Sequence, residues 1–289
     1  MIPLDPVRCT FCLVYSRLKP LMDRPDLSTR MLAFLEEAME RGDPLPKMFE
    51  ESYEYQSLLL GQPDPLRRVK KLLNQKFSYL VSGLRLEAMS LKSLLETMAK
   101  ANTVDIDMPG YSPGRDVGTL GGTVHWFPNG AHSLVEEAET LALVLDNAGE
   151  AVVDLAVAGE LARRGYRVWL VARGEAFETD VTVEEVREMM PGNVEGLVST
   201  GGRHSAFSPK ASREARSVLE RVDAVIAKGI ANMEALLSHP GNLARKTLLL
   251  LRAKCGPVAD SLGLERLAPI AARGDALLER LDPRCPEKN

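Results

Sequence analysis

The residues best suited to chemistry in this chain follow a short apolar run that ends at Leu145. Directly after it stand Asp146, Asn147, Ala148, Gly149 and Glu150. A carboxylate beside an amide offers two hard oxygen ligands, which suit Mg²⁺, Mn²⁺ or a similar divalent cation. The small residues that follow allow a bound group to approach the backbone closely. The same residue types are common in an Asx turn, so the segment predicts either a cation site or a turn.

Four further apolar runs also lead into polar residues, which widen the candidate set. Beyond their ends stand a carboxylate, two hydroxyls, two lysines and an amide: Asp180, Ser199, Thr200, Lys228, Asn232 and Lys254. Where parallel strands end at one edge of a sheet, such groups meet in a single crevice. Oxygen ligands for a cation, with hydroxyls and lysines for a phosphate, predict phosphoryl chemistry. Taken singly, each segment is also typical of an ordinary turn or a solvated strand end.

The elements that must position these side chains begin near residue 120. Helical segments such as 151–163 and 211–221 separate short apolar runs at 141–145, 166–171, 194–198, 224–226 and 248–251. This alternation predicts an α/β fold with a Rossmann-like, mostly parallel sheet and helices on both faces.

The first part of the chain has a different pattern. Apolar residues recur at helical spacing through 15–105, for example at Met31, Leu35 and Met39. A Gly- and Pro-rich passage at 108–114 then predicts a linker. We therefore expect an N-terminal helical domain, 1–118, that closes over the crevice, and an α/β domain, 119–289, that ends in a frayed tail.

Composition narrows the class of protein. The chain has 289 residues and a formal net charge of -4, which gives no electrostatic footprint for nucleic-acid binding. Its longest apolar run, 248–251, is far too short to span a bilayer, and the first residues do not read as a signal peptide. Four cysteines in a chain of this length do not make a disulfide scaffold. These features predict a cytoplasmic protein with no membrane or nucleic-acid partner, and they leave the oligomeric state open.

Several motifs, in their order along the chain, resemble those of the metal-dependent damage-control phosphatases, a family long called domain of unknown function eighty-nine. The motifs are Cys9-x-x-Cys12, Gly61-Gln62-Pro63-Asp64-Pro65 with Lys70 and Asn74, Ala101-Asn102-Thr103-Val104-Asp105, Asp-Asn-Ala-Gly-Glu from Asp146, Lys-Gly-x-x-Asn from Lys228, and Lys254-Cys255. The resemblance runs almost end to end. The cysteine motifs are similar to those of the branch rich in archaeal members. The sequence departs from the family pattern at three positions, with Ala101 for Gly, Thr179 for Asn and Gly256 for Glu.

The resemblance implies a metal-dependent phosphomonoester hydrolase that acts on sugar phosphates or damaged cofactor phosphates. It implies a divalent ion (Mg, Mn, Ni or Co) held by Asp146, Asn147 and Asp180. It places the substrate phosphate near Lys228, with Ser199, Thr200, Asn232 and Asn102 as further binding residues. Attack on phosphorus would come from a water on the metal or from Asp146 itself. Two alternatives stay open: a carboxyl O-methyltransferase and a non-catalytic protein that binds metal or phosphate. A dinucleotide-dependent oxidoreductase is excluded, because no Gly-x-Gly loop follows the first strand.

The cysteines define a possible second site. Cys9 and Cys12 have the spacing of metal ligands, and Cys255 could join them in space. A structural zinc site would need a fourth ligand, for which His204, His239 and Cys285 are candidates. A buried thiol pair or a redox-labile disulfide is an equal alternative.

Overall fold

The structure, a computed structural model, describes residues 5–104, 109 and 120–281. Most of the expected linker at 108–114 and the expected tail from Asp282 lie outside these residues, as do Asp105 and Cys285. No helix of the described residues is long and apolar enough to cross a membrane.

A seven-stranded sheet forms the centre of the molecule. Its strands are β1 (His125–Phe127), β2 (Thr140–Val144), β3 (Arg167–Ala172), β4 (Gly196–Ser199), β5 (Ala224–Lys228), β6 (Thr247–Arg252) and β7 (Pro269–Arg273), in the order β1-β7-β6-β5-β2-β3-β4. The strands from β6 to β4 are parallel, whereas β7 runs antiparallel to β6. The prediction of a mostly parallel α/β sheet is confirmed.

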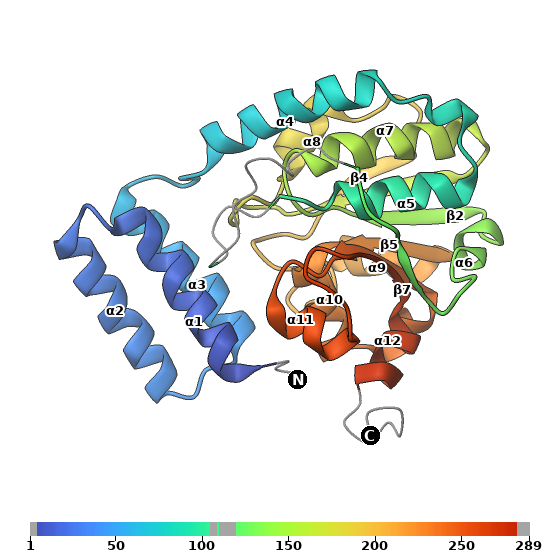
Figure 1. Cartoon of the computed structure of the whole chain (residues 1–289). Coiled ribbons are helices and arrows are strands. Elements are labelled where there is room, and N and C mark those ends of the chain that lie inside the picture. The colour runs from blue at the N-terminus through green and yellow to red at the C-terminus, as the bar shows by residue number, and fades with distance from the viewer. Residues whose placement is uncertain (1–4, 105–108, 110–119, 282–289) are drawn as a thin grey trace.

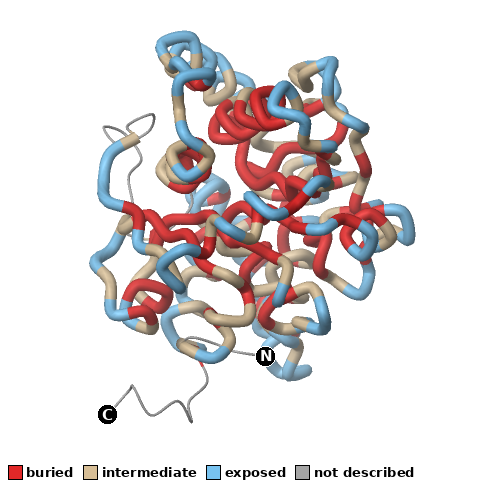
Figure 2. Tube along the Cα trace, turned by 90° about the vertical axis from the view of Figure 1, so that its right-hand side faces the viewer, coloured by how far each residue is buried: buried red, intermediate tan, exposed pale blue. Residues whose placement is uncertain are grey.

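Helices cover both faces of this sheet, and the alternation of side chains along each strand explains why. Leu141, Leu143 and Leu145 pack on one face against α5 (Leu91–Ala101), α7 (Glu150–Arg163) and α8 (Val183–Met189). Ala142 and Val144 pack on the other face, with the apolar residues of four more helices. These are α9 (Arg213–Arg221), α10 (Gly229–Ser238), α11 (Gly256–Leu262) and α12 (Gly274–Leu281). Figure 1 shows α5 and α7 above the sheet and α10 to α12 below it, and Figure 2 shows that the buried residues gather in the interior of the molecule.

The N-terminal helices divide into two groups. A small bundle consists of α1 (Pro6–Leu18), α2 (Pro25–Glu40) and α3 (Leu45–Leu60), with the 3-10 turn η1 (Lys19–Leu21) and a core that includes Leu13, Leu21 and Met31. By contrast, α4 (Arg67–Ser82) lies along α7, and α5 contributes Leu94, Leu95 and Met98 to the sheet core. The helical character of this region is confirmed. The domain boundary at 118 stays a prediction, although the bundle that stands apart from the sheet ends with α3 (Figure 1).

Three short elements complete the described chain. They are η2 (Leu86–Ala88), α6 (Ser133–Glu136) and η3 (Gly241–Lys246).

The order of the strands fixes where a crevice can form. From β2, the chain passes to β3 and β4 on one side, whereas β5 and β6 lie on the other side. Connections that leave neighbouring strands in opposite directions open a crevice at the carboxyl ends of those strands. Here the two strands are β2, which leads into Asp146, and β5, which ends at Lys228. The topology therefore places the strongest sequence candidates at the switch point.

Candidate functional site

The turn between β2 and α7 holds Asp146 and Asn147, which are 3% and 7% exposed. Asn147 Nδ2 donates to Oδ2 of Asp146 and, at 2.8 Å, to Oε1 of Glu150. Gly149 begins the helix with a φ of 86°, and a Cβ there would lie 2.9 Å from the ring of Phe77. The turn can therefore pack closely against α4 only because residue 149 has no side chain.

A second turn brings Asp180 to the first. Asn147 and Asp180 form an isolated antiparallel bridge. The amide of Val181 donates to the carbonyl of Asp146 at 2.9 Å, and the amide of Ala148 donates to the carbonyl of Thr179 at 2.8 Å. The hydroxyl of Thr179 also donates to Asn147 Oδ1. The structure thus brings together the two carboxylates and the amide that the sequence singled out as metal ligands.

Asn102 joins this cluster from the end of α5, as the sequence motif suggested. Its Nδ2 donates to Glu150 Oε1 at 2.7 Å and to Asp146 Oδ2 at 3.3 Å. Its Oδ1 accepts the amide hydrogen of Arg252 on β6 at 3.0 Å. Asn102 therefore ties α5 and the sheet to the Asp146 carboxylate.

The electrostatics of the cluster favour a bound cation. Burial raises the pKa of Asp146 well above its ordinary value, and the neighbouring carboxylates of Asp180 and Glu150 raise it further. Burial also raises the pKa of Asp180. Arg173 opposes this rise, because its Nε donates a hydrogen bond to Oδ2 of Asp180. Buried carboxylates this close together need positive charge or protons. A set of carboxylate and amide oxygens with excess negative charge fits a divalent ion.

Lys228 lies elsewhere than the sequence led us to expect. We expected its ammonium in the crevice beside Asp146, but it is fully buried and donates to Met98 O at 2.6 Å and to Glu150 and Asp154 at 3.0 Å each. The reason is strand alternation, because Lys228 shares a face with Ile226 and points toward α5 and α7. Lys228 therefore neutralises Glu150 and Asp154 behind Asp146, and its role as a phosphate clamp stays a prediction.

Asn232 likewise acts on the backbone. Its Nδ2 donates to the carbonyls of Leu145 at 3.2 Å and Lys228 at 2.8 Å, and its Oδ1 accepts from the Ser205 hydroxyl at 2.7 Å. Because the two carbonyls belong to the ends of neighbouring strands, Asn232 closes the floor of the crevice. The role of Asn232 as a phosphate-binding residue stays a prediction.

Ser199 ends β4 and Thr200 follows it, and β3 separates this strand from β2. Ser199 Oγ accepts the amide hydrogen of Gly201 at 3.0 Å, and Thr200 Oγ1 donates to the carbonyl of Gly202 at 3.0 Å. Both hydroxyls thus shape the turn after β4. The structure does not bring them to the Asp146 cluster, and their role as phosphate ligands stays a prediction.

Two further cations lie near the cluster: Lys254, which belongs to the set that the sequence predicts for a phosphate, and Arg173, which the sequence did not single out. Arg173 comes directly after β3, 5% exposed, and pairs with Asp180. Lys254, 3% exposed, donates to the carbonyl of Val104 at 2.7 Å and is the cation that lowers the pKa of Asp146 most. Arg173, like Lys254, is a basic residue just beyond a predicted strand, a signal that could have found it.

The N-terminal bundle meets the site at the loops after β3 and β4. Arg17 of α1 pairs with Glu178 at 2.7 Å, the ring of Tyr53 of α3 lies 5.4 Å from that of Phe177, and Glu50 of α3 pairs with His204 at 2.7 Å. The bundle therefore touches the turn that carries Asp180, and its role as a cover over the site stays a prediction.

The cysteines lie where α1 meets α10 and α11. Burial raises the pKa of the Cys9 thiol, and Glu234 of α10 raises it further. Arg8 of α1 donates to Asp260 of α11 at 2.6 Å, and Cys255 precedes the first turn of that helix. The described residues contain no group of three or more His, Cys, Asp or Glu side chains that could hold a metal ion. The zinc site stays a prediction, and the Asp146, Asn147 and Asp180 set is of another kind, since one of its members is an amide.

Comparison with known proteins finds similarity both in sequence and in fold. A family model described as the damage-control phosphatase ARMT1-like domain matches residues 21–268. A damage-control phosphatase of Archaeoglobus fulgidus is 34% identical over 121 residues, which is 41% of each chain. A damage-control phosphatase of Pyrococcus horikoshii is 28% identical over 141 residues, or 48% of each chain, so the alignments span less than half of these relatives. The crystal structure of a DUF89 family protein from Pyrococcus horikoshii has the same fold, with a TM-score of 0.74 at 21% identity over 92% of this chain and 97% of that one.

Proposed function

Because this chain belongs to the damage-control phosphatase ARMT1-like family, we propose that it is a metal-dependent phosphatase of small phosphorylated metabolites. The observation that carries the proposal is the buried cluster of Asp146, Asn147 and Asp180 at the switch point of the sheet. The names of the two archaeal relatives support the phosphatase activity and its place in metabolite damage control.

Asp146, Asn147 and Asp180 would hold a divalent cation such as Mg²⁺, Mn²⁺, Ni²⁺ or Co²⁺. When bound, such an ion neutralises phosphate charge and polarises the phosphorus–oxygen bonds. The surrounding residues preorganise these ligands, which is where a protein contributes most to a metal site. Asn102 and Asn147 both donate to Oδ2 of Asp146 and fix the plane of its carboxylate. Arg173 holds Asp180 in the same way.

Lys254 is the lysine best placed to add positive charge for a phosphate. It acts on Asp146 more strongly than any other cation, whereas Lys228 acts on Glu150 and Asp154 behind it. A lysine serves a phosphate as a compact point charge and needs no bidentate geometry. We therefore transfer to Lys254 the electrostatic role that the sequence suggested for Lys228.

The polar side chains where the bundle meets the loops after β3 and β4 suit a hydroxyl-rich substrate. Where α3 meets the loops after β3 and β4, Glu50 pairs with His204, and Arg203 pairs with Glu175 at 2.7 Å. Carboxylates, a guanidinium and an imidazole can exchange hydrogen bonds with sugar hydroxyls. This favours sugar phosphates as substrates, with phosphorylated cofactor fragments as a second class.

A methyltransferase fits the turn after β2 less well. That turn carries Asp146 and Asn147 and packs its glycine against Phe77, whereas nucleoside cofactors use a glycine-rich loop at this place. A non-catalytic metal-binding protein would keep the ligands but release no phosphate.

A phosphate-release assay separates these functions. Protein stripped by a chelator should not hydrolyse p-nitrophenyl phosphate, and it should regain activity with one or more of the four ions. A panel of sugar phosphates and phosphorylated cofactor fragments then ranks the substrates. Metal binding without turnover on any ester would favour the non-catalytic alternative. Methyl transfer from S-adenosylmethionine would favour the methyltransferase.

A further inference from the structure

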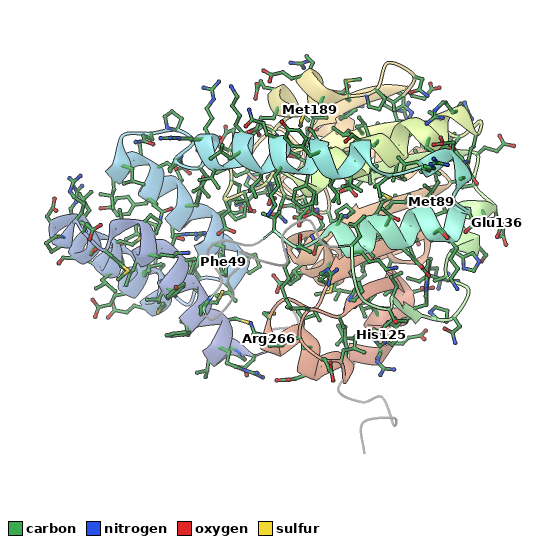
Figure 3. The ribbon with its side chains drawn as sticks, turned by 45° about the horizontal axis from the view of Figure 1, so that its top comes forward. Phe49, Met89, His125, Glu136, Met189 and Arg266 are labelled. Atoms are coloured by element: carbon green, nitrogen blue, oxygen red, sulfur yellow. The ribbon has the colours of Figure 1, made fainter. Side chains whose placement is uncertain are left out.

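Arg17, in the N-terminal bundle, is buried to an extent unusual for an arginine. It is 1% exposed, and its guanidinium lies 5.4 Å from the ring centroids of both Phe49 and Tyr53 on α3. Nε donates to Ser52 Oγ at 2.9 Å, and Nη2 donates to the carbonyl of Phe49 at 3.0 Å. Figure 3 labels Phe49 on this helix. The guanidinium is thus held rigidly by α3.

From this fixed position Arg17 reaches out of the bundle to the α/β part of the molecule. Its Nη2 also donates to Glu178 Oε1 at 2.7 Å, and the carboxylate of Glu178 is 28% exposed. A charged hydrogen bond with one buried partner is screened less by water than a surface ion pair. Glu178 has a φ of 45°, a left-handed conformation that is unfavourable for a residue with a side chain. The ion pair is therefore one of the contacts that hold this conformation.

The strained residue stands inside the turn that presents Asp180. Phe177, one residue earlier, lies between the ring of Tyr53 and the guanidinium of Arg173, which is 4.5 Å from its centroid. Thr179, one residue later, bonds to Asn147 through its hydroxyl and to Ala148 through its carbonyl. A change at Glu178 therefore reaches both Asn147 and Asp180 within two residues.

We infer that Arg17 is a positioning residue, which fixes the Asp180 turn through Glu178 and so couples the bundle to the proposed metal site. The part that concerns metal affinity rests on the proposed function. The mechanical part, that Arg17 restrains the turn, does not depend on it.

Hydrogen–deuterium exchange on the metal-free full chain tests the mechanical part. The amides of Ala148, Asp180 and Val181 are the reporters, because their hydrogen bonds hold the turn. Arg17→Met and Glu178→Gln should each speed their exchange by about 10-fold, since local opening costs less once the tie is lost. The matched control is Met31→Ala, which removes a fully buried side chain from the bundle core. It should lower the melting temperature but leave these amides unchanged.

Calorimetric titration of Mn²⁺ tests the coupling. Both single variants should bind Mn²⁺ about 10-fold more weakly, the usual scale for residues that orient metal ligands. The double variant should lose no more than either single one, because the two residues act as a unit. Arg17→Lys, which keeps the charge, should recover part of the affinity.

Unchanged exchange in Arg17→Met would overturn the inference, as would equal effects in Met31→Ala. If wild-type protein bound no divalent ion while exchange still rose in Arg17→Met, the proposed function would fail but the restraint by Arg17 would stand.

Discussion

A Cβ atom at Gly229 would lie 1.8 Å from Oδ2 of Asp146, so the first turn of α10 lies directly against this carboxylate. Gly229 also has a φ of 77°. The end of β5 can therefore approach the turn after β2 only because this residue lacks a side chain. In the Lys-Gly pair of the sequence motif, Lys228 thus supplies positive charge behind the site, and Gly229 leaves space for the Asp146 carboxylate.

Gly229→Ala should displace the Asp146 carboxylate and remove most phosphatase activity together with metal affinity. Gly263→Ala is the matched control, because its φ is 65° but a Cβ there would meet nothing within 4 Å. It should suffer only backbone strain, about 1–2 kcal/mol. Calorimetric metal titration and thermal melting of both variants check this. Wild-type metal affinity in Gly229→Ala would show that Asp146 is not a ligand.

Lys228→Met should act chiefly on stability. Removing the ammonium leaves Glu150 and Asp154 buried without their partner, which costs about 3–5 kcal/mol. Adding Asp154→Asn to this variant should recover part of the loss, since one of the two carboxylates is then neutral. Chemical denaturation of the wild type and the single and double variants measures both effects. A stable Lys228→Met protein with strongly reduced kcat would instead restore the phosphate-clamp role.

Asp154 should make stability depend on pH near neutrality. Burial raises its pKa to about 7, Lys228 counteracts this shift and Glu150 adds to it. A carboxyl whose folded pKa is raised contributes stability that is complete below its unfolded pKa, 3.8, and is lost as pH rises through about 7. The wild type should therefore lose melting temperature relative to Asp154→Asn between pH 5 and pH 8.5. Parallel curves for the two proteins would contradict this account.

Thr179 replaces the asparagine that the family pattern often has, and its hydroxyl still serves the site by bonding to Asn147. Thr179→Val keeps the shape but removes this bond, so Mn²⁺ affinity should fall about 10-fold, the equivalent of one hydrogen bond. Thr179→Ser should retain it. Equal affinities in Val and Ser variants would mean that the bond does not orient Asn147.

The five strands from β2 to β6 were predictable because each contains a short, mainly apolar run, as strands covered on both faces do. The other two strands gave no such signal. His125–Phe127 has three residues, and Pro269–Arg273 begins with proline and pairs antiparallel. Helical spacing likewise predicted helices before residue 105, but it could not tell that α4 and α5 pack on the sheet while α1 to α3 form their own core.

Within the site, the resemblance to the phosphatase family implied Asp146, Asn147, Asp180 and Asn102 as site residues, and the structure brings them together. The contacts of Lys228 with Glu150 and Asp154 were not foreseen, because the position of a strand end does not show toward which face of the sheet its side chain points. The roles of Arg17 and Glu178 depend on contacts 161 positions apart in the sequence, which no local pattern reveals.

The most direct test of the central claim compares phosphate release by chelator-treated wild type and Asp180→Asn while Mn²⁺ is titrated back. The wild type should regain activity in step with the occupancy of one tight site. Asp180→Asn should fold normally and bind Mn²⁺ far more weakly. It should release phosphate at least about 100-fold more slowly, because Asp146, Asn147 and Asp180 act together as one ligand set. Wild-type activity that survives complete removal of metal, or an Asp180→Asn protein with unchanged affinity and turnover, would contradict the account.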